Sequence, residues 1–385
     1  MKKIPITIPF IDNKDQMKVA KAIKYGWGDK CFENIKNFEK KFKKKYKLEY
    51  TSATSSCTGA LHLALMSLGI KKGDEVILPD ITWVSCANAI KYVGATPVFA
   101  DIKEDTWCID PSDIEKKITK KTKAIMVVHI YGNVCDMSSI SKLIKKNKLF
   151  LIEDCAEAIG AKYKNKYVGT FGDASVFSFH GTKTITTGEG GMFVCKSKKV
   201  WNNYQLIHNM GKNPKQPKYF FLDVIGLKYK ISNIQAALGE SQLDKINYLI
   251  KMKKKVYNNY KKILNNEIFQ LNKPEIDTIS TYWMTTLTIK NIKLKKNFKE
   301  KLIEYCMQKN IHLRPFFYPL SSMPMYKSNK KSDNKIAYKL TQNSVNLPSG
   351  YNLKLNEIKR VCDAIYDFLR LQNINFLNND KKKLS

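Results

Sequence analysis

One lysine of the chain lies in a sequence context suited to covalent chemistry. Lys183 follows residues 175–179, whose alternating side chains are typical of a half-buried strand, and precedes a glycine-rich turn at 188–191. Most lysines are solvated surface groups. At the mouth of such a strand, however, the amine can lose solvent and attack a carbonyl carbon. We therefore interpret Lys183 as a lysine that forms a Schiff base.

An acidic residue upstream of this lysine is a second candidate. Residues 148–154 predict an apolar strand that ends in Asp154, and ligands bind at the carboxyl edge of an open α/β sheet. A strand-terminal Asp alone is more often a helix cap. Together with Lys183, its carboxylate is suited to pair with the protonated pyridine nitrogen of pyridoxal phosphate.

A third element is predicted at residues 53–65, where small and hydroxyl side chains run into the apolar period of a helix. The free N–H groups and the positive dipole end of such a helix bind phosphate, and Ser56 or Thr58 would add a hydroxyl contact. A helix start without a ligand has the same pattern. This element therefore supports a cofactor site only together with the other two.

These three elements, in this order, resemble the sugar-nucleotide aminotransferases of pyridoxal-phosphate fold type I known as the DegT/DnrJ/EryC1/StrS family. The resemblance covers nearly the whole chain, and within the family it is strongest to 4-aminotransferases of the perosamine synthase type. It implies a large α/β domain, with a mostly parallel seven-stranded sheet between helices, and a smaller α+β domain. Further matching segments are 73–79, 94–99, 128–132, 168–173, 229–239 and 314–319.

The resemblance also implies a role for each matching residue. Lys183 would hold the cofactor covalently and then shuttle protons, while Asp154 would pair with the pyridine nitrogen and Glu157 would approach the ring hydroxyl. Trp83 would stack on the ring, although an isolated tryptophan is more often a core or interface residue. Asn233 would reach the phosphate from a second subunit, which implies a homodimer with shared active sites. The phosphate cradle would consist of Ser56, Cys57, Thr58 and Ser178.

Two further residues are candidates for the substrate pocket. His180 either lines that pocket or is a structural imidazole. Arg314 either grips a substrate phosphate or carboxylate with both of its terminal nitrogens or braces the small domain through an ion pair. Family members that dehydrate the sugar at C-3 carry histidine in place of the lysine, so Lys183 favours transamination.

The implied reaction has two halves. An amino donor, by resemblance L-glutamate, leaves its amine on the cofactor as pyridoxamine phosphate and departs as 2-oxoglutarate. A nucleotide-linked 4-keto-6-deoxyhexose then takes up the amine, giving a 4-amino-4,6-dideoxy sugar for a surface polysaccharide such as O-antigen or capsule. One lysine serves as acid and base in both halves.

Two departures from the family pattern concern the cofactor and the acceptor. The phosphate-binding block reads Ser-Ser-Cys-Thr at 55–58 in place of Ser-Asn-Gly-Thr, a form that some relatives share. In the block at 25–35, Phe32 replaces the glycine that usually follows the Gly-Trp segment, and this bulkier side chain would reshape part of the sugar-nucleotide pocket. A 3-keto sugar nucleotide or a small phosphorylated ketone is therefore the alternative acceptor.

The length of 385 residues predicts two domains. Strand-like runs alternate with helical segments in the first part, which favours a mostly parallel sheet covered by helices. We predict a large cofactor-binding domain over 1–245, a smaller α+β domain over 246–372 and a polar, disordered tail over 373–385.

Composition argues against several other classes of protein. The formal net charge of +33 comes almost entirely from lysine, whereas base recognition depends mainly on arginine, so no nucleic-acid partner is expected. A cofactor-binding regulator would need a DNA-binding module, for which the chain has no spare segment. Nine cysteines without a Cys-x-x-Cys pair predict neither disulfides nor a metal site, and they suggest a reducing, cytoplasmic location. No signal peptide or membrane-spanning stretch is expected.

Overall fold

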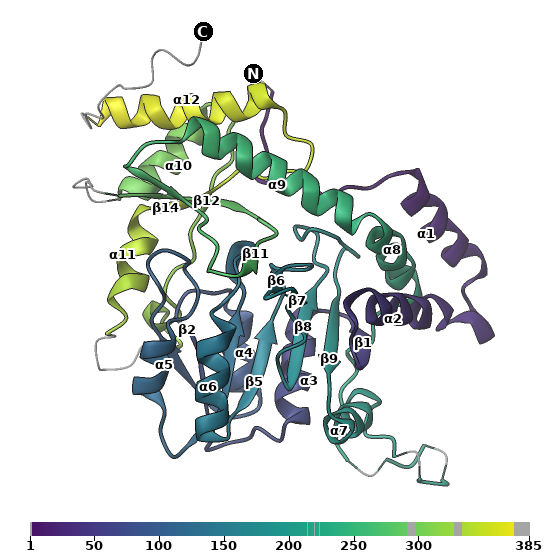
Figure 1. Cartoon of the computed structure of the whole chain (residues 1–385). Helices are drawn as coiled ribbons and strands as arrows, with labels where there is room; N and C mark the ends of the chain where they lie inside the picture. Colours follow the sequence, from purple (N-terminus) through teal and green to yellow (C-terminus); the bar gives the residue numbers. More distant parts are fainter. Residues whose placement is uncertain are drawn as a thin grey trace.

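The computed structural model describes residues 2–213, 215–218, 220–222, 224–290, 297–326 and 333–372. The larger part is built on a seven-stranded sheet (Figure 1). Its strands are β1 (Tyr50–Thr54), β2 (Glu75–Pro79), β3 (Thr96–Ala100), β4 (Thr122–Val128), β5 (Phe150–Asp154), β8 (Ala174–Ser178) and β9 (Gly191–Cys195). They lie in the order β1-β9-β8-β5-β4-β2-β3, where β9 pairs antiparallel with β1 and β8 and the other neighbouring pairs are parallel. The predicted sheet is confirmed.

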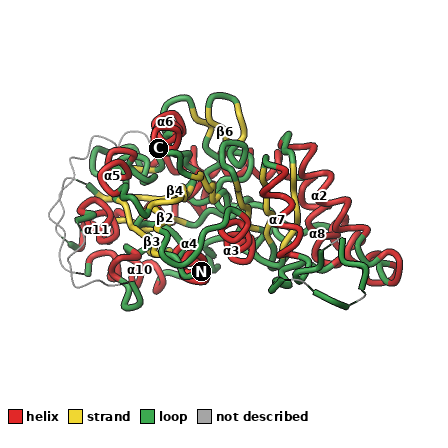
Figure 2. Tube along the Cα trace, turned by 90° about the horizontal axis from the view of Figure 1, so that it is seen from below, coloured by secondary structure: helices red, strands yellow, loops and turns green. Residues whose placement is uncertain are grey.

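Helices cover both faces of this sheet. In Figure 2, α5 (Pro111–Lys117) and α6 (Met137–Asn147) lie on one face, whereas α3 (Cys57–Ser67) and α4 (Ser85–Tyr92) lie on the other. The central strands are consequently buried on both sides, which explains their continuous apolar runs. The other helices of this part are α1 (Asn13–Tyr25), α2 (Glu33–Tyr46), α7 (Lys198–His208) and α8 (Asn233–Asp244).

Capping side chains explain where three of these helices begin. Asp110 and Asp136 accept hydrogen bonds from the N–H groups of Ser112 and Ser139 at the starts of α5 and α6. Ser56 caps α3 in the same way. Each cap follows the carboxyl end of a parallel strand, so the helix starts gather at one edge of the sheet.

The C-terminal part contains a second, antiparallel sheet. Its order is β10-β12-β14-β13, formed by β10 (Phe269–Leu271), β12 (Thr285–Ile289), β13 (Arg314–Pro315) and β14 (Ser344–Leu347). A separate hydrophobic cluster lies between this sheet and three helices, α9 (Ile246–Ile263), α10 (Phe298–Gln308) and α12 (Leu355–Leu371). Helix α11 (Lys335–Asn343) packs on the core of the large sheet through Ala337 and Leu340. Short elements are η1 (Gly28–Lys30), η2 (Ile130–Gly132), η3 (Leu320–Ser322), β6 (Lys162–Tyr163), β7 (Lys166–Tyr167) and β11 (Thr278–Ile279).

The two parts exchange segments. Ile4 packs in the C-terminal cluster, whereas Leu320 packs in the core of the large sheet. The division into 1–245 and 246–372 therefore stays a prediction, and the predicted tail at 373–385 lies outside the described residues.

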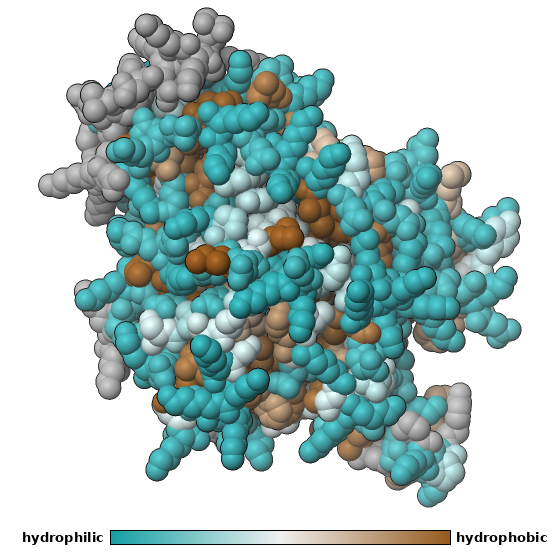
Figure 3. Space-filling model, viewed as in Figure 1, coloured by the Kyte–Doolittle hydropathy of each residue, from teal (hydrophilic) through white to brown (hydrophobic). Residues whose placement is uncertain are grey.

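The face of the protein seen in Figure 3 is mainly hydrophilic, in keeping with a chain in which 26% of the residues are charged. Within the described ranges, no helix combines the length and the apolar character needed to cross a membrane.

Candidate active site

Lys183 lies in the loop between β8 and β9. Its backbone N–H donates to the carbonyl oxygen of His180 over 2.9 Å, which closes a tight turn after the strand. The side chain is 14% exposed, and Nζ lies 3.4 Å from Oε1 of Glu157. On its other side, Nζ lies 3.8 Å from the centroid of the Trp283 ring. The amine is thus largely removed from solvent, between a carboxylate and an indole.

Asp154 is the last residue of β5, the strand that pairs in parallel with β8. Its Oδ1 accepts a hydrogen bond from the N–H of Ala156 over 2.9 Å, and its Oδ2 accepts one from the thiol of Cys86 over 3.1 Å. Burial and the charge of Asp154 raise the pKa of the Cys86 thiol well above its usual range. Cys86 therefore donates as a neutral thiol, and the carboxylate is held at the end of its strand.

Glu157 follows in the loop after β5. Its Oε2 accepts a hydrogen bond from the N–H of Tyr131 over 2.8 Å, and its other oxygen faces Lys183. Burial raises the pKa of Glu157, and the charge of Lys183 opposes that shift. The charge of Lys183 therefore favours the ionised form of Glu157 within a dry part of the site.

The first turn of α3 lies at the same edge of the sheet. Ser56 accepts a hydrogen bond from the N–H of Gly59 over 3.0 Å, whereas the N–H groups of Cys57 and Thr58 precede the point where partners inside the helix begin. A Cβ at Gly191 would lie 2.7 Å from the nitrogen of Cys57, so only glycine allows β9 to approach this turn so closely. We call this turn and the carboxyl ends of β5 and β8, with their following loops, the sheet edge.

Ser178 belongs to the sheet edge, and Trp83 lies in the loop between β2 and α4. Ser178 ends β8, and its Oγ accepts a hydrogen bond from the N–H of His180 over 3.3 Å. The indole of Trp83 is 60% exposed, with the ring of Phe317 at a centroid distance of 6.2 Å. An uncovered indole face at this position is available for stacking.

The two predicted substrate residues lie in different environments. The side chain of His180 is 49% exposed, and its ring contacts Thr182 Oγ1 at 3.0 Å and Glu189 at 3.5 Å. Arg314 lies in β13, in register with Asn346. It forms no ion pair with any carboxylate among the described residues, so a bracing ion pair of Arg314 is not found there.

Asn233 begins α8 and makes contacts within its own chain. Its side chain accepts a hydrogen bond from the N–H of Asn34 over 3.0 Å and donates one to the carbonyl oxygen of Gly26 over 3.0 Å. It therefore fastens the turn between α1 and α2. Its predicted contact to a phosphate bound by a second subunit stays a prediction.

Two segments of the C-terminal part lie over the sheet edge, and we call residues 280–284 and 316–323 the cover. Trp283 of the first segment contacts the lysine amine. Tyr131 lies nearly parallel to Trp283 and to Phe317 of the second segment, at centroid distances of 6.3 and 5.4 Å. A row of aromatic rings thus links the two segments of the cover.

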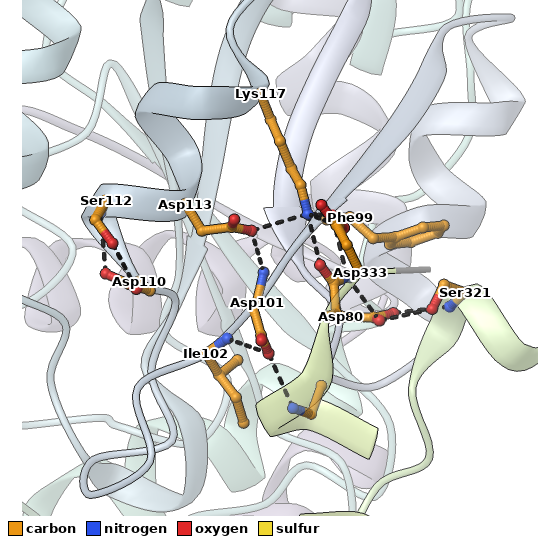
Figure 4. Close-up of polar contacts among 12 residues, drawn as sticks. Asp80, Phe99, Asp101, Ile102, Asp110, Ser112, Asp113, Lys117, Ser321 and Asp333 are labelled. Carbon is orange, nitrogen blue, oxygen red and sulfur yellow. Dashed lines mark hydrogen bonds and ion pairs between the residues drawn. The ribbon is translucent and has the colours of Figure 1, made fainter. Parts of the chain in front are cut away.

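A polar network fastens the second segment of the cover to the large sheet (Figure 4). Asp80, directly after β2, accepts hydrogen bonds from the N–H and Oγ of Ser321 over 2.7 and 2.6 Å and from Nδ2 of Asn334 over 2.8 Å. Burial raises the pKa of Asp80, and these hydrogen bonds oppose the shift. Lys117 joins the network through Asp113, 2.8 Å away, and through Oδ1 of Asn334.

A buried group with metal-like spacing lies behind the sheet edge. His129, Glu153 and Cys155 offer ligand atoms within 4.8 Å of one another. However, His129 Nε2 contacts Glu153, and the same carboxylate accepts N–H bonds from Phe171 and Gly172 over 2.7 and 2.6 Å. These bonds already use the carboxylate, so we interpret the group as a support for the loop between β7 and β8.

Two site residues were not identified from the sequence. Cys86 shows no pattern of its own, because its role depends on the approach of α4 to the end of β5. Trp283 lies in a run, 281–289, that predicts only a strand region of the small domain. Its position near Lys183 arises from tertiary packing, for which the sequence carries no local pattern.

The residues at the sheet edge fit pyridoxal phosphate. Asp154 Oδ2 has a thiol as its described donor, which leaves a lone pair for a pyridine N–H. The open first turn of α3 would hold the phosphate, Trp83 would cover the ring, and Lys183 would bind the aldehyde carbon. When bound, the cofactor supplies an electron sink that stores and releases an amino group.

Comparisons with known proteins agree with this chemistry. The sequence profile described as the DegT/DnrJ/EryC1/StrS aminotransferase family matches residues 9–366. The chain is 43% identical over 368 residues to the GDP-perosamine synthase of Escherichia coli O157:H7, covering 96% of this chain and 99% of that protein. It is 37% identical over 369 residues to the GDP-perosamine synthase of Vibrio cholerae, covering 95% and 99%.

Solved structures show the same fold. Helicobacter pylori PseC, an aminotransferase involved in the biosynthesis of pseudoaminic acid, superposes with a TM-score of 0.88 at 27% identity, covering 96% of this chain and 100% of that one. The PLP form of the putative sugar aminotransferase Spr1654 from Streptococcus pneumoniae gives a TM-score of 0.89 at 25% identity, covering 97% and 100%.

Proposed function

Because the chain belongs to the DegT/DnrJ/EryC1/StrS aminotransferase family, we propose that it transfers an amino group from L-glutamate to the 4-keto group of a nucleotide-linked 6-deoxyhexose. It is a pyridoxal-phosphate-dependent aminotransferase of the sugar-modifying kind. The observation that carries the proposal is the amine of Lys183, which is largely buried beside Glu157 and lies in the loop that follows β8, the strand next to the one that ends in Asp154. This is the arrangement that covalent capture of a carbonyl cofactor and proton transfer require.

Each residue of the sheet edge has a proposed task. Lys183 Nζ carries a proton between the α-carbon of the amino donor and the cofactor, and then returns it in the second half-reaction. Asp154 keeps the pyridine nitrogen protonated, and Glu157 orients the lysine and approaches the ring hydroxyl. The first turn of α3 and Ser178 hold the phosphate.

Similarity to GDP-perosamine synthases favours a 4-keto acceptor and guanosine diphosphate as its nucleotide. The identity of 43% extends over nearly the full length of both proteins, so the regions that contact the substrate are included. His180 and Arg314 are proposed to contact the acceptor. The product would be a 4-amino-4,6-dideoxy sugar nucleotide for a surface polysaccharide, O-antigen or capsule.

We further propose a cytoplasmic homodimer with shared active sites. The region after α7 exposes apolar side chains, including Phe220 at 87% and Ile225 at 90%, which a second copy would cover. Asn233 would then contact the phosphate of the partner's site. All nine cysteines are free, in keeping with a reducing compartment.

The test begins with the absorbance spectrum of the purified protein with pyridoxal phosphate, before and after addition of L-glutamate. Conversion to the pyridoxamine form is expected, and Lys183→Ala should abolish it, whereas Lys196→Ala, which changes an exposed lysine, should not. The aminated protein is then offered GDP- and dTDP-linked 4-keto-6-deoxyhexoses, a 3-keto sugar nucleotide and a phosphorylated ketone, with mass spectrometry of the products. Amination of only the last two would replace the 4-keto proposal with the alternative acceptor.

A further inference from the structure

Trp283 contacts the loop of the active-site lysine at two points, one on Thr182 and one on Lys183. The indole Nε1–H donates to the carbonyl oxygen of Thr182, the residue before the lysine, over 2.8 Å. The face of the same indole lies 3.8 Å from Nζ of Lys183. Attraction between an ammonium and an aromatic face acts within about 6 Å and is strongest for tryptophan. One side chain of the cover therefore holds both the backbone and the amine of this loop.

The indole is fixed from several directions. Trp283 is 2% exposed, and its backbone carbonyl oxygen accepts a hydrogen bond from Nζ of the buried Lys253 over 3.2 Å. The preceding residues are anchored to η2, because Ser280 Oγ and the N–H of Thr281 both donate to the carbonyl oxygen of Gly132, over 2.8 and 3.2 Å. These contacts hold the segment that carries the ring.

Gly132 is required for this anchoring. Its φ of +94° is a conformation that other residues rarely adopt, and a Cβ there would lie 2.5 Å from the nitrogen of Tyr282. The backbone of the 280–284 segment therefore packs directly on the turn that also presents the N–H of Tyr131 to Glu157. The lysine, the carboxylate and the indole form one connected unit.

We propose that Trp283 is a positioning residue whose indole face holds the ammonium of Lys183 whenever the lysine is not joined to the cofactor. With pyridoxal phosphate, the lysine nitrogen would form a C=N bond to the aldehyde carbon as the C=O bond breaks, and two of the ammonium protons would leave with the oxygen as water, so the ammonium and its contact with the indole would be lost. With pyridoxamine phosphate there is no aldehyde, and the lysine keeps that contact. Trp283 therefore stabilises the states of the catalytic cycle in which the lysine is free. This inference rests on the family's cofactor and on neither the donor nor the acceptor of the proposed function.

The test compares the affinities of the cofactor-free protein for pyridoxal phosphate and pyridoxamine phosphate. In Trp283→Leu, the lysine has no indole contact to lose when it binds pyridoxal phosphate. The affinity of the protein for pyridoxal phosphate should therefore rise relative to its affinity for pyridoxamine phosphate by about 2- to 30-fold. Trp283→Phe loses the Nε1–H bond but keeps an aromatic face, so its ratio should stay much closer to that of the original protein. Trp107→Leu is the matched control, because Trp107 is also fully buried and packs on Tyr131.

The ratio separates positioning from packing. Loss of packing alone weakens the binding of both forms of the cofactor equally and leaves the ratio of the two affinities unchanged. This result is expected for Trp107→Leu. The same result for Trp283→Leu would overturn the proposal. An equal shift in Trp283→Phe and Trp283→Leu would also overturn it, because the Nε1–H bond would then be responsible. If Trp283→Leu does not fold, Trp283→Met replaces it, since a methionine fills more of the space without an aromatic face.

Discussion

The amine of Lys183 lies between two regions that contribute to the site in different ways. The sheet edge supplies charges and hydrogen-bond donors from residues that end a strand or begin a helix, such as Asp154 and Ser56. The cover supplies mainly aromatic rings, with Trp283 on the lysine and Phe317 beside Trp83. The groups proposed to react or to bind the cofactor thus lie in the large sheet and the loops that follow its strands, whereas the groups that surround them come from segments joined to it by side-chain contacts.

This difference predicts which measurements each region controls. Changes at the sheet edge should act on the rate of the chemistry, because its groups are the ones proposed to contact the cofactor. Changes in the cover should act first on stability and on the preference between cofactor forms, because its groups hold other residues. Variants chosen from each region therefore test whether the two regions control different measurements.

The largest effect is expected at the sheet edge. Asp154→Asn replaces the carboxylate that is proposed to pair with the pyridine nitrogen by a neutral amide of the same size, which would weaken the electron sink. We expect the single-turnover rate of amine transfer from glutamate to fall by about 10²- to 10³-fold, with little change in the unfolding midpoint. Stopped-flow absorbance of the cofactor measures the rate. A tenfold or smaller loss would show that the pyridine nitrogen is held by another group.

The cover should respond mainly in stability. Asp80→Ala leaves the buried donors of Ser321 and Asn334 without their acceptor, and we expect the free energy of unfolding in urea to fall by about 2 to 4 kcal/mol. Asp333→Ala is the control, because this side chain belongs to the same network but is 76% exposed, and its loss should change stability by less than about 1 kcal/mol. Equal effects of the two variants would contradict the role of the Asp80 contacts.

The contrast also explains how far the site was predictable. Asp154 and Lys183 follow recognisable strands, and Ser56 begins a helix, so short-range patterns indicate both their secondary structure and their place at one edge of the sheet. Trp283 reaches the lysine only because the 280–284 segment packs on Gly132, a contact between parts that are distant in the chain. Such packing leaves no periodicity in the sequence.

Asn233 illustrates the same limit in a residue that was identified. Its match to the family predicts a partner's phosphate as its target, whereas its side chain contacts Gly26 and Asn34 within the chain. A motif match specifies the residue type and its element, but the atoms around it depend on how α8 packs against α1 and α2. In the proposed homodimer, the position of the second subunit decides whether these contacts are retained or exchanged.

A pH titration tests the cover further. Burial lowers the pKa of Lys253 to about 7, while its Nζ donates to the carbonyl oxygens of Ser349 and Trp283. Since the unfolded chain binds this proton up to about pH 10.5, the free energy of unfolding should rise with pH between about 7 and 10.5, by about 2 to 4 kcal/mol. Lys253→Met should remove this rise, whereas Lys254→Met, an exposed neighbour on α9, should keep it. A rise that persists in Lys253→Met must belong to other groups.

The smallest effect is expected at Cys86, which lies on α4 and contacts Asp154 of the sheet edge. The thiol of Cys86 shares Oδ2 of Asp154 with the pyridine nitrogen that this oxygen would bind, so Cys86→Ala should strengthen the hold on pyridoxal phosphate, by less than about tenfold. Cys86→Ser, which keeps a donor, should stay within about twofold of the original affinity. Cys135→Ala removes another buried thiol, one that donates to the carbonyl oxygen of Val128, and should leave the affinity for pyridoxal phosphate unchanged. A lower affinity for pyridoxal phosphate in Cys86→Ala would mean that the thiol orients the carboxylate and does not compete for it. The sheet edge, like the cover, would then depend on a contact that no short-range sequence pattern reveals.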